Sequence, residues 1–354
     1  MRTVKIGNQE LSIPLIQGGM GIGISRCNLA GAVAKNGGMG VISAAQVGYD
    51  REGFTAHPEK TNLLELPEQI KRAKEISGGC GMIGVNTMAV TQLYGEYVKQ
   101  VCRAGADAII TGAGLPTSLP QYIEGNHTKI APIVSSEKAL QVILKYWDKK
   151  YARTADFIVV EGPKAGGHLG FSFEQLDHIQ SYDFDEEAKK IIATKTFYEE
   201  KYGKSIPLFL AGGISCQQDV RHALTLGADG VQVATRFVTT AECDASEQYK
   251  RAYVQAEEKD ITIIHSPVGM PGRAIRNAFV ERMKAGQEHI SGCYNCLKAC
   301  NPKTAAYCIS QALINAVKGD LENGLIFCGA KVGDIKSITT VKNVIEELQL
   351  GWIK

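Results

Sequence analysis

The feature that most constrains the fold is a regular alternation of short apolar runs with longer amphipathic stretches along the first 240 residues. Eight runs rich in Val, Ile and Leu are candidate strands: residues 13–16, 40–43, 82–85, 108–110, 130–134, 157–160, 207–210 and 230–233. Six stretches with apolar residues at three- and four-residue steps are candidate helices: residues 28–35, 66–76, 92–104, 136–151, 186–202 and 217–226. Continuous apolar strands that alternate with helices predict a parallel sheet covered on its outside.

Eight such units favour a (β/α)8 TIM barrel over a doubly wound sheet, which more often has five to seven strands. In a barrel of this kind the loops after the strands form the active face. We therefore predict an α/β fold with a (β/α)8 barrel over residues 1–240. Residues 241–354 contain the turn-rich SPVGMPGR (266–273), a cysteine cluster and a final helix near 340–350, and they predict a mainly helical C-terminal cap.

Charge and terminal composition exclude several kinds of partner. The 354 residues carry 39 basic and 37 acidic side chains without a polybasic stripe, so we expect no nucleic-acid or membrane partner and a small-molecule or acyl-thioester substrate. The N-terminus MRTVKIGNQE lacks the apolar core of a secretory signal, and no run approaches a membrane span. We expect a cytoplasmic protein, with a homodimer as a candidate assembly.

Glycine gathers where the strands should end, in QGGMG (17–21), TGAG (111–114), AGGH (165–168) and AGGI (211–214). Backbone without Cβ atoms can approach a ligand closely and present amide N–H groups to an anion. The first loop lacks the Gly-x-Gly-x-x-Gly spacing of dinucleotide-binding folds. A mononucleotide phosphate held by the amides of Gly212 and Gly213 and by the loop around Thr235 fits better, because barrels often bind phosphate after strands seven and eight.

A single histidine, His168, lies in the glycine-rich EGPKAGGHLG (161–170). With an ordinary pKa of about 6.5, histidine can give or take a proton near neutral pH. We predict that His168 is catalytic. The alternatives are a hydrogen bond that only stabilises the loop and, for the neighbouring Lys164, a solvated surface lysine.

Six of these segments, in their order and spacing, resemble the FMN-dependent nitronate monooxygenase family, which includes the enoyl-acyl-carrier-protein reductase II enzymes. They are QGGMG, AGAVAKNGGMGVIS (30–43), GVN (84–86), EGPKAGGHLG, AGGIS (211–215) and GADGVQVATRF (227–237). The resemblance implies that Gly19 and Met20 lie against the flavin, that Asn86 hydrogen-bonds the ring and that Lys164 lies near its polar edge. It implies that Gly212, Gly213 and Thr235 hold the phosphate and that His168 is the catalytic base or acid. The remaining cofactor contacts that it implies are Gly21, Glu161, Ala165, Gly167, Ala211 and Ala234.

Within this family, two activities compete. The stretches TGAGLP (111–116) and VATRF (233–237) favour an NAD(P)H-dependent reductase of an activated C=C bond in an enoyl thioester. The alternative is a nitronate monooxygenase that oxidises alkyl nitronates with O2. A flavin- or phosphate-binding regulatory protein and a sugar-phosphate isomerase or aldolase are more distant alternatives. The placement of His168 argues against the first, and the strand ends show no clear catalytic lysine or carboxylate pair for the second.

Four cysteines, Cys293, Cys296, Cys300 and Cys308, have the spacing Cys-x2-Cys-x3-Cys-x7-Cys. Four thiolates can bind zinc or an iron–sulfur cluster, although this spacing does not match the ferredoxin register. Two alternatives stay open. The first three cysteines can form a buried stripe on a helix, since they recur at i, i+3 and i+7, or a pair can form a redox disulfide.

Overall fold

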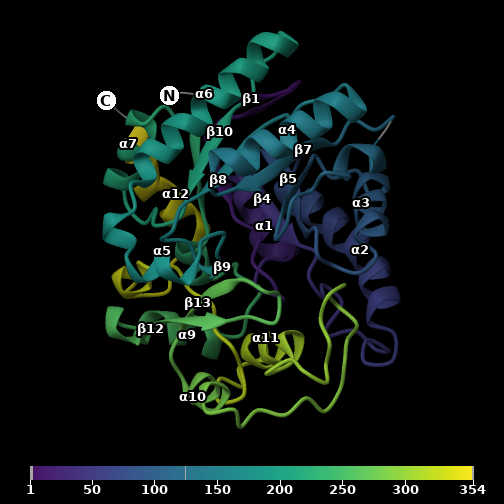
Figure 1. Ribbon diagram of the computed structural model, residues 1–354, viewed down its shortest axis with the longest axis vertical. Helices are drawn as coiled ribbons and strands as arrows, with labels where there is room; N and C mark the ends of the chain where they lie inside the picture. Colours follow the sequence, from purple (N-terminus) through teal and green to yellow (C-terminus); the bar gives the residue numbers. More distant parts are fainter. Residues whose placement is uncertain (1–2, 124, 353–354) are drawn as a thin grey trace.

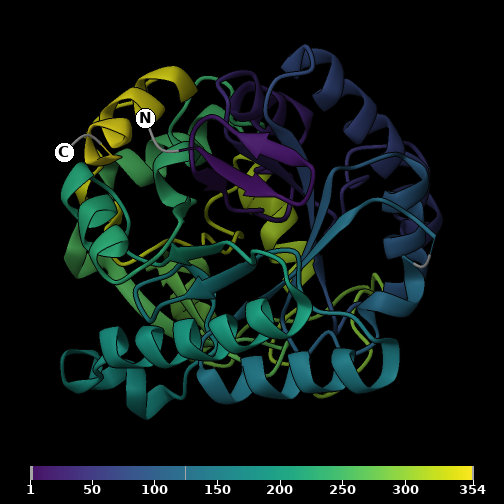
Figure 2. The same cartoon turned by 90° about the horizontal axis from the view of Figure 1, so that it is seen from above.

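The computed structural model describes residues 3–123 and 125–352, and its centre is a closed barrel of eight parallel strands (Figures 1 and 2). Their order around the barrel is β10-β11-β3-β4-β5-β6-β7-β8. The barrel strands are β3 (Leu15–Gln17), β4 (Met39–Ser43), β5 (Met82–Met88), β6 (Ala108–Gly112), β7 (Lys129–Val134), β8 (Ile158–Glu161), β10 (Leu208–Ala211) and β11 (Gly230–Val233). Each predicted strand overlaps one of these, so the TIM barrel is confirmed.

The strands are buried on both faces, which explains why their sequences are continuously apolar. In β8, Val159 packs inside the barrel with Phe209 and Met39, while Ile158 and Val160 pack outside under the helices. Side chains of a strand alternate between its faces, so neither face of the run can be polar.

A hairpin near the N-terminus closes one end of the barrel. Its strands β1 (Val4–Ile6) and β2 (Gln9–Leu11) pair antiparallel, and Val4, Ile6 and Leu11 join the interior cluster. This cluster includes Met39 and Met82, the first residues of β4 and β5, so the hairpin lies at the amino ends of the strands. The carboxyl ends are left for a ligand.

Helices surround the barrel as the periodicity predicts. They are α1 (Cys27–Lys35), α2 (Pro58–Ser77), α3 (Tyr94–Arg103), α4 (Glu137–Tyr151), α6 (Phe184–Tyr202) and α7 (Gln217–Thr225). Shorter helices lie in the loops: η1 (Leu119–Tyr122), α5 (Phe173–Asp177), η2 (Ile179–Ser181) and α8 (Thr235–Val238). Helix ends follow local chemistry, since the Ser136 hydroxyl accepts the Ala139 amide at the start of α4 and Gly203 takes a left-handed conformation after α6.

The cap lies over the carboxyl ends of the strands (Figure 1). It contains α9 (Glu247–Gln255), η3 (Glu258–Asp260), β12 (Ile261–His265), β13 (Pro271–Ile275), α10 (Ala278–Lys284), α11 (Ile309–Lys318) and η4 (Val332–Asp334). A third strand, β9 (Gly167–His168), comes from the loop after β8 and pairs antiparallel with β13 of the β12–β13 pair. The prediction of a mainly helical cap did not include this small sheet, whose third strand is two residues long and pairs with a distant part of the chain.

One part of the predicted cap packs on the barrel instead. Helix α12 (Val341–Gln349), followed by η5 (Leu350–Trp352), contacts α1 and α7. Its Val341, Val344, Ile345 and Leu348 belong to the core between strands and helices. The division at residue 240 therefore stays a prediction, and the last helix completes the outer layer of the barrel.

Among residues 3–123 and 125–352, no helix combines the length and the apolar character that crossing a bilayer requires.

Candidate active site

A cavity of about 470 Å³ lies at the carboxyl ends of the barrel strands, between the barrel loops and the cap. This is the end of a TIM barrel where active sites are found. The fourteen residues predicted for catalysis and cofactor binding all line it: Gly19, Met20, Gly21, Asn86, Glu161, Lys164, Ala165, Gly167, His168, Ala211, Gly212, Gly213, Ala234 and Thr235. The structure thus brings the whole predicted set together, while the role of each residue stays a prediction.

The loop after β10 has a backbone that only glycine adopts readily. Gly212 and Gly213 have φ values of +93° and +83°. A Cβ on Gly212 would lie 2.7 Å from the carbonyl oxygen of Gly162, and one on Gly213 would lie 2.9 Å from the Cβ of Lys164. Both residues are therefore glycine for steric reasons, and successive amides in such a turn can form an anion-binding concavity.

The neighbouring loop after β11 is tied to the cap. The hydroxyl of Thr235 accepts a hydrogen bond from the amide of Gly329 at 3.2 Å. Gly329 and Lys331 also line the cavity, and the Lys331 ammonium pairs with Asp219 at 2.5 Å. Neither cap residue could be found from the sequence, because nothing near it in the sequence marks it as a neighbour of the loop after β11.

On another side of the cavity, Gly19 packs against Asn86. A Cβ on Gly19 would lie 2.4 Å from the Cβ of Asn86, so the QGGMG loop can pass this side chain only because Gly19 has none. The amide nitrogen of Asn86 donates to the carbonyl of Ile110 at 3.2 Å, which holds the side chain at the end of β5. Its carbonyl oxygen is left to accept a further hydrogen bond.

His168 belongs to a barrel loop, but the cap fixes its position. Its backbone pairs with Gly272 of β13, its ring lies edge-on to Phe327 with centroids 5.0 Å apart, and Nε2 lies 2.7 Å from the Oγ of Ser266. The Ser266 oxygen also accepts the amide of Val268 at 3.2 Å, and its own proton can go to the imidazole in the tautomer that carries hydrogen on Nδ1. Ser266 therefore positions His168 from 98 residues away.

Burial lowers the pKa of His168 from 6.5 to about 4. The half-buried His168 side chain lines the cavity beneath the cap, where the charged imidazolium is poorly solvated. The ordinary pKa assumed from the sequence is thus wrong for this site. His168 is a neutral imidazole at neutral pH.

Glu161 also has an unusual protonation state. Burial raises its pKa from 4.5 to about 8, although the nearby charge of Arg273 lowers it. Arg273 is itself buried and donates to the carbonyl of Ala165. At neutral pH the cavity therefore contains a protonated carboxyl group, which can donate a hydrogen bond that a carboxylate cannot.

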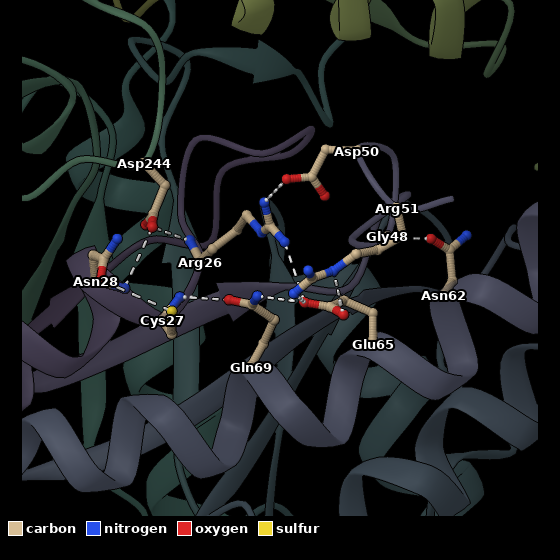
Figure 3. A network of polar contacts seen from close by, with 10 residues as sticks. All are labelled: Arg26, Cys27, Asn28, Gly48, Asp50, Arg51, Asn62, Glu65, Gln69 and Asp244. Atoms are coloured by element: carbon tan, nitrogen blue, oxygen red, sulfur yellow. Dashed lines mark hydrogen bonds and ion pairs between the residues drawn. The ribbon is translucent and has the colours of Figure 1, made fainter. Parts of the chain in front are cut away.

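A partly buried polar network supports the loops that follow β3 and β4 (Figure 3). The carboxylate of Asp244 accepts the amides of Arg26, Asn28 and Leu29 at the start of α1, at 2.9, 3.4 and 3.2 Å. The Arg26 guanidinium in turn pairs with Asp50 at 2.7 Å and with Glu65 at 3.2 Å. These contacts tie α1, α2 and the chain after β11 together behind the cavity wall.

The four predicted metal ligands lie in the cap. Cys296 lines the cavity, whereas Cys293, Cys300 and Cys308 do not. All four are free thiols, so the described structure contains no disulfide among them. Across residues 3–123 and 125–352, no three His, Cys, Asp or Glu side chains are placed to hold one metal ion. A metal at this position stays a prediction.

Comparisons of this chain with known proteins point to one family. A family model described as nitronate monooxygenase matches residues 2–351. A probable nitronate monooxygenase from Staphylococcus saprophyticus is 26% identical over 311 residues, which cover 80% of this chain and 81% of that protein.

Two further relatives carry other names. A (3aS,4S,5R,7aS)-5-hydroxy-7a-methyl-1-oxo-octahydro-1H-indene-4-carboxyl-CoA dehydrogenase from Mycobacterium tuberculosis is 26% identical over 274 residues, 77% of this chain and 66% of that protein. The structure of FabK from Thermotoga maritima has a TM-score of 0.73 to this chain at 26% identity, and the match covers 97% of this chain and 93% of that one. With the family model spanning almost every residue, this chain belongs to the nitronate monooxygenase family and is an FMN-dependent oxidoreductase.

Proposed function

We propose that this enzyme uses NAD(P)H to reduce an activated carbon–carbon double bond in an enoyl thioester. The observation that carries the proposal is the apolar wall that the cap adds to the cavity: Val268, Met270, Leu297, Ile309 and Leu313. Burial of apolar surface is worth roughly 25 cal/mol per Å², so such a wall favours a substrate with an acyl chain. A small alkyl nitronate would leave most of it uncovered.

Two of the similar proteins support this substrate class. FabK is an enoyl-acyl-carrier-protein reductase II, and the mycobacterial relative is named for a carboxyl-CoA substrate. A carboxyl-CoA is a thioester of coenzyme A, the same chemical class as the proposed enoyl thioester. The similarity of these two proteins to this chain is modest, and the apolar wall is the reason to transfer the substrate class.

The cavity residues fit FMN. The Gly212–Gly213 turn and the Thr235 loop offer amide and hydroxyl donors for its phosphate, while Gly19 and Asn86 leave a backbone surface and a free acceptor for its ring. When bound, FMN supplies hydride acceptance from a pyridine nucleotide and hydride donation to a substrate.

The chain itself must then stabilise the charge that develops on the substrate, while the α-carbon takes its proton from solvent. Addition of hydride to the β-carbon of an enoyl thioester places negative charge on the thioester oxygen. A neutral imidazole can donate a hydrogen bond to this oxygen, and the Ser266 contact restricts the ring to one orientation. His168 therefore stabilises the enolate as a neutral donor, and the protonated Glu161 adds a second uncharged donor to the cavity.

Nitronate oxidation is the second candidate. It is favoured by the family description and by the relatives named probable nitronate monooxygenases. The low pKa of His168 also suits a base, because a neutral imidazole is present at neutral pH to take a proton from a nitroalkane. Here O2 would be the oxidant.

An anaerobic stopped-flow experiment separates the two candidates. Flavin reduction is followed after mixing the holoenzyme with NADH, with NADPH or with propyl-2-nitronate. Rapid reduction by a pyridine nucleotide, followed by reoxidation with crotonyl-CoA, is the expected result. Reduction by the nitronate alone would reject the reductase and select the monooxygenase.

A cytoplasmic location, a homodimer and the absence of nucleic-acid and membrane partners are proposals that rest on the sequence alone. The metal predicted at the four cysteines has no step in the proposed reduction.

A further inference from the structure

The donors proposed above for the flavin phosphate are all uncharged. Gly212, Gly213 and Thr235 offer backbone amides and a hydroxyl from the loops after β10 and β11. A phosphate monoester carries a charge of roughly −1.5 to −2 at neutral pH. Because opposite charges attract more strongly in a partly buried site than in water, a cation beside these loops adds affinity that neutral donors cannot supply.

A short segment of the cap, immediately before η4, lies against these loops. The amide of Gly329 donates to the Thr235 hydroxyl at 3.2 Å. The amide of Ala330 donates to the carbonyl of Lys164 at 3.1 Å. Lys164 in turn borders the glycine turn, because a Cβ on Gly213 would lie 2.9 Å from the Cβ of Lys164. The cap segment therefore reaches both loops that are proposed to hold the phosphate.

The next residue of this segment, Lys331, brings a positive charge to the same place. Its side chain lines the cavity, and its ammonium lies 2.5 Å from the carboxylate of Asp219. The other oxygen of Asp219 accepts the amides of Ser215 and Cys216 at 2.8 and 3.1 Å. Ser215 is only two positions after Gly213, so this carboxylate holds the ammonium close to the glycine turn.

The Lys331 ammonium has donors left for a further partner. A lysine ammonium carries three N–H donors, and among the described residues only Asp219 accepts from this one. The side chains of the pair are 32% and 20% exposed, so the charge is shielded by solvent only in part. Arg236 also lines the cavity, but its guanidinium already donates to the Ser215 carbonyl and pairs with Glu347.

We propose that Lys331 binds the phosphate of FMN, so that the cap supplies the cation of a site whose neutral donors come from the barrel. The proposal rests on the FMN site of the proposed function and is independent of the choice between the two reactions. Lys331 keeps its contact with Asp219 and donates a second hydrogen bond to a phosphate oxygen. Riboflavin has the same ring and ribityl chain without the phosphate, so Lys331 determines the preference for FMN over riboflavin.

The alternative role of the Lys331–Asp219 pair is to join the cap to the barrel and nothing more. Loss of a purely structural pair weakens the packing of the cap, and this effect does not depend on the phosphate. It therefore lowers the affinities for FMN and riboflavin by the same factor. Loss of a contact with the phosphate lowers the affinity for FMN alone.

The test measures the Kd of FMN and of riboflavin by quenching of flavin fluorescence, with the full chain from which flavin has been removed. Lys331→Met removes the charge and keeps an unbranched side chain. For this variant we expect the Kd of FMN to rise roughly 10-fold and that of riboflavin to change by less than about twofold. Lys331→Arg should keep most of the affinity for FMN. Lys336→Met is the matched control, because Lys336 is exposed and does not line the cavity.

The ratio of the riboflavin Kd to the FMN Kd decides the outcome. A ratio that falls in Lys331→Met but not in Lys336→Met supports the proposal, and unchanged binding of riboflavin shows that the variant is folded. Added salt should lower the ratio more for the wild type than for Lys331→Met, because salt screens an ion pair. An equal loss of both affinities, or an unchanged Kd of FMN, would overturn the proposal. Neither result affects the proposed reduction, since flavin binding is measured without turnover.

Discussion

Replacement of His168 by glutamine tests the assignment of a neutral imidazole. Burial lowers the pKa of this ring to about 4, so about one molecule in a thousand carries an imidazolium at pH 7. A role that needs the charged ring would then use a very small fraction of the enzyme. A role as a neutral hydrogen-bond donor uses nearly all of it.

Ser266 and Phe327 hold the imidazole ring of His168 in one position. Glutamine keeps a donor group, but its side chain cannot place that donor where the ring nitrogen lies. Loss of one donor to a developing oxyanion typically lowers kcat by roughly 10²- to 10³-fold, and we expect a decrease of that size. Flavin content should not change, since the phosphate donors proposed above lie on other loops.

The assay is the reoxidation of reduced flavin by crotonyl-CoA, followed anaerobically in a stopped-flow instrument across a range of pH. For the wild type we expect a rate that stays level as pH falls through 6.5 and changes only toward about 4, where the ring takes up its second proton. His178→Gln is the matched control, because His178 is exposed and does not line the cavity. An inflection near pH 6.5 that disappears in His168→Gln, or full activity of that variant, would refute the reasoning.

Three further substitutions test other parts of the site. Gly213→Ala places a side chain at a φ of +83° and 2.9 Å from Lys164. A left-handed backbone costs alanine roughly 1–2 kcal/mol. The Kd of FMN, measured by fluorescence titration, should therefore rise about 5- to 30-fold. Gly53→Ala, at a φ of +79° with nothing within 4 Å, should bind FMN as tightly as the wild type. Asp244→Ala removes the acceptor of three amides and should lower the free energy of unfolding by about 2 kcal/mol in urea; an unchanged midpoint would contradict this. Glu161 has a raised pKa, so its contribution to stability is complete below about pH 4.5 and is lost as pH rises to about 8. Glutamine does not titrate, and the Tm of Glu161→Gln relative to the wild type should therefore rise between these two pH values. A difference in Tm that stays constant with pH would count against this prediction.

The barrel could be predicted because each of its strands has a sequence pattern that is visible within the strand itself. Each strand is buried on both faces, as β8 shows, so its sequence is apolar without alternation and stands out from the helices around it. The glycines of the active face are equally visible, since Gly212 and Gly213 are required by their own backbone conformation and by close neighbours. With the strands placed, their carboxyl ends identify one rim, and the whole predicted site lies there.

The cap could not be predicted in the same way, because its contacts join residues that are far apart in sequence. The spacing of Cys293, Cys296 and Cys300 was compatible with a helix, but residues 287–308 form an irregular loop with no helical structure. Helix α12 has an ordinary amphipathic pattern, and only the shape of the barrel decides that it fills a gap beside α1 and α7.

The sequence by itself determined the fold, the end of the barrel that carries the site and the identity of the predicted site residues there. The reason is that strand burial and glycine backbone geometry leave patterns in neighbouring positions of the chain. Only the tertiary structure decided the chemical state of those residues. His168 loses its ordinary pKa, and gains Ser266 as a partner, when the cap closes over it and removes water. Desolvation depends on every atom that surrounds a group, and most of those atoms come from distant parts of the chain.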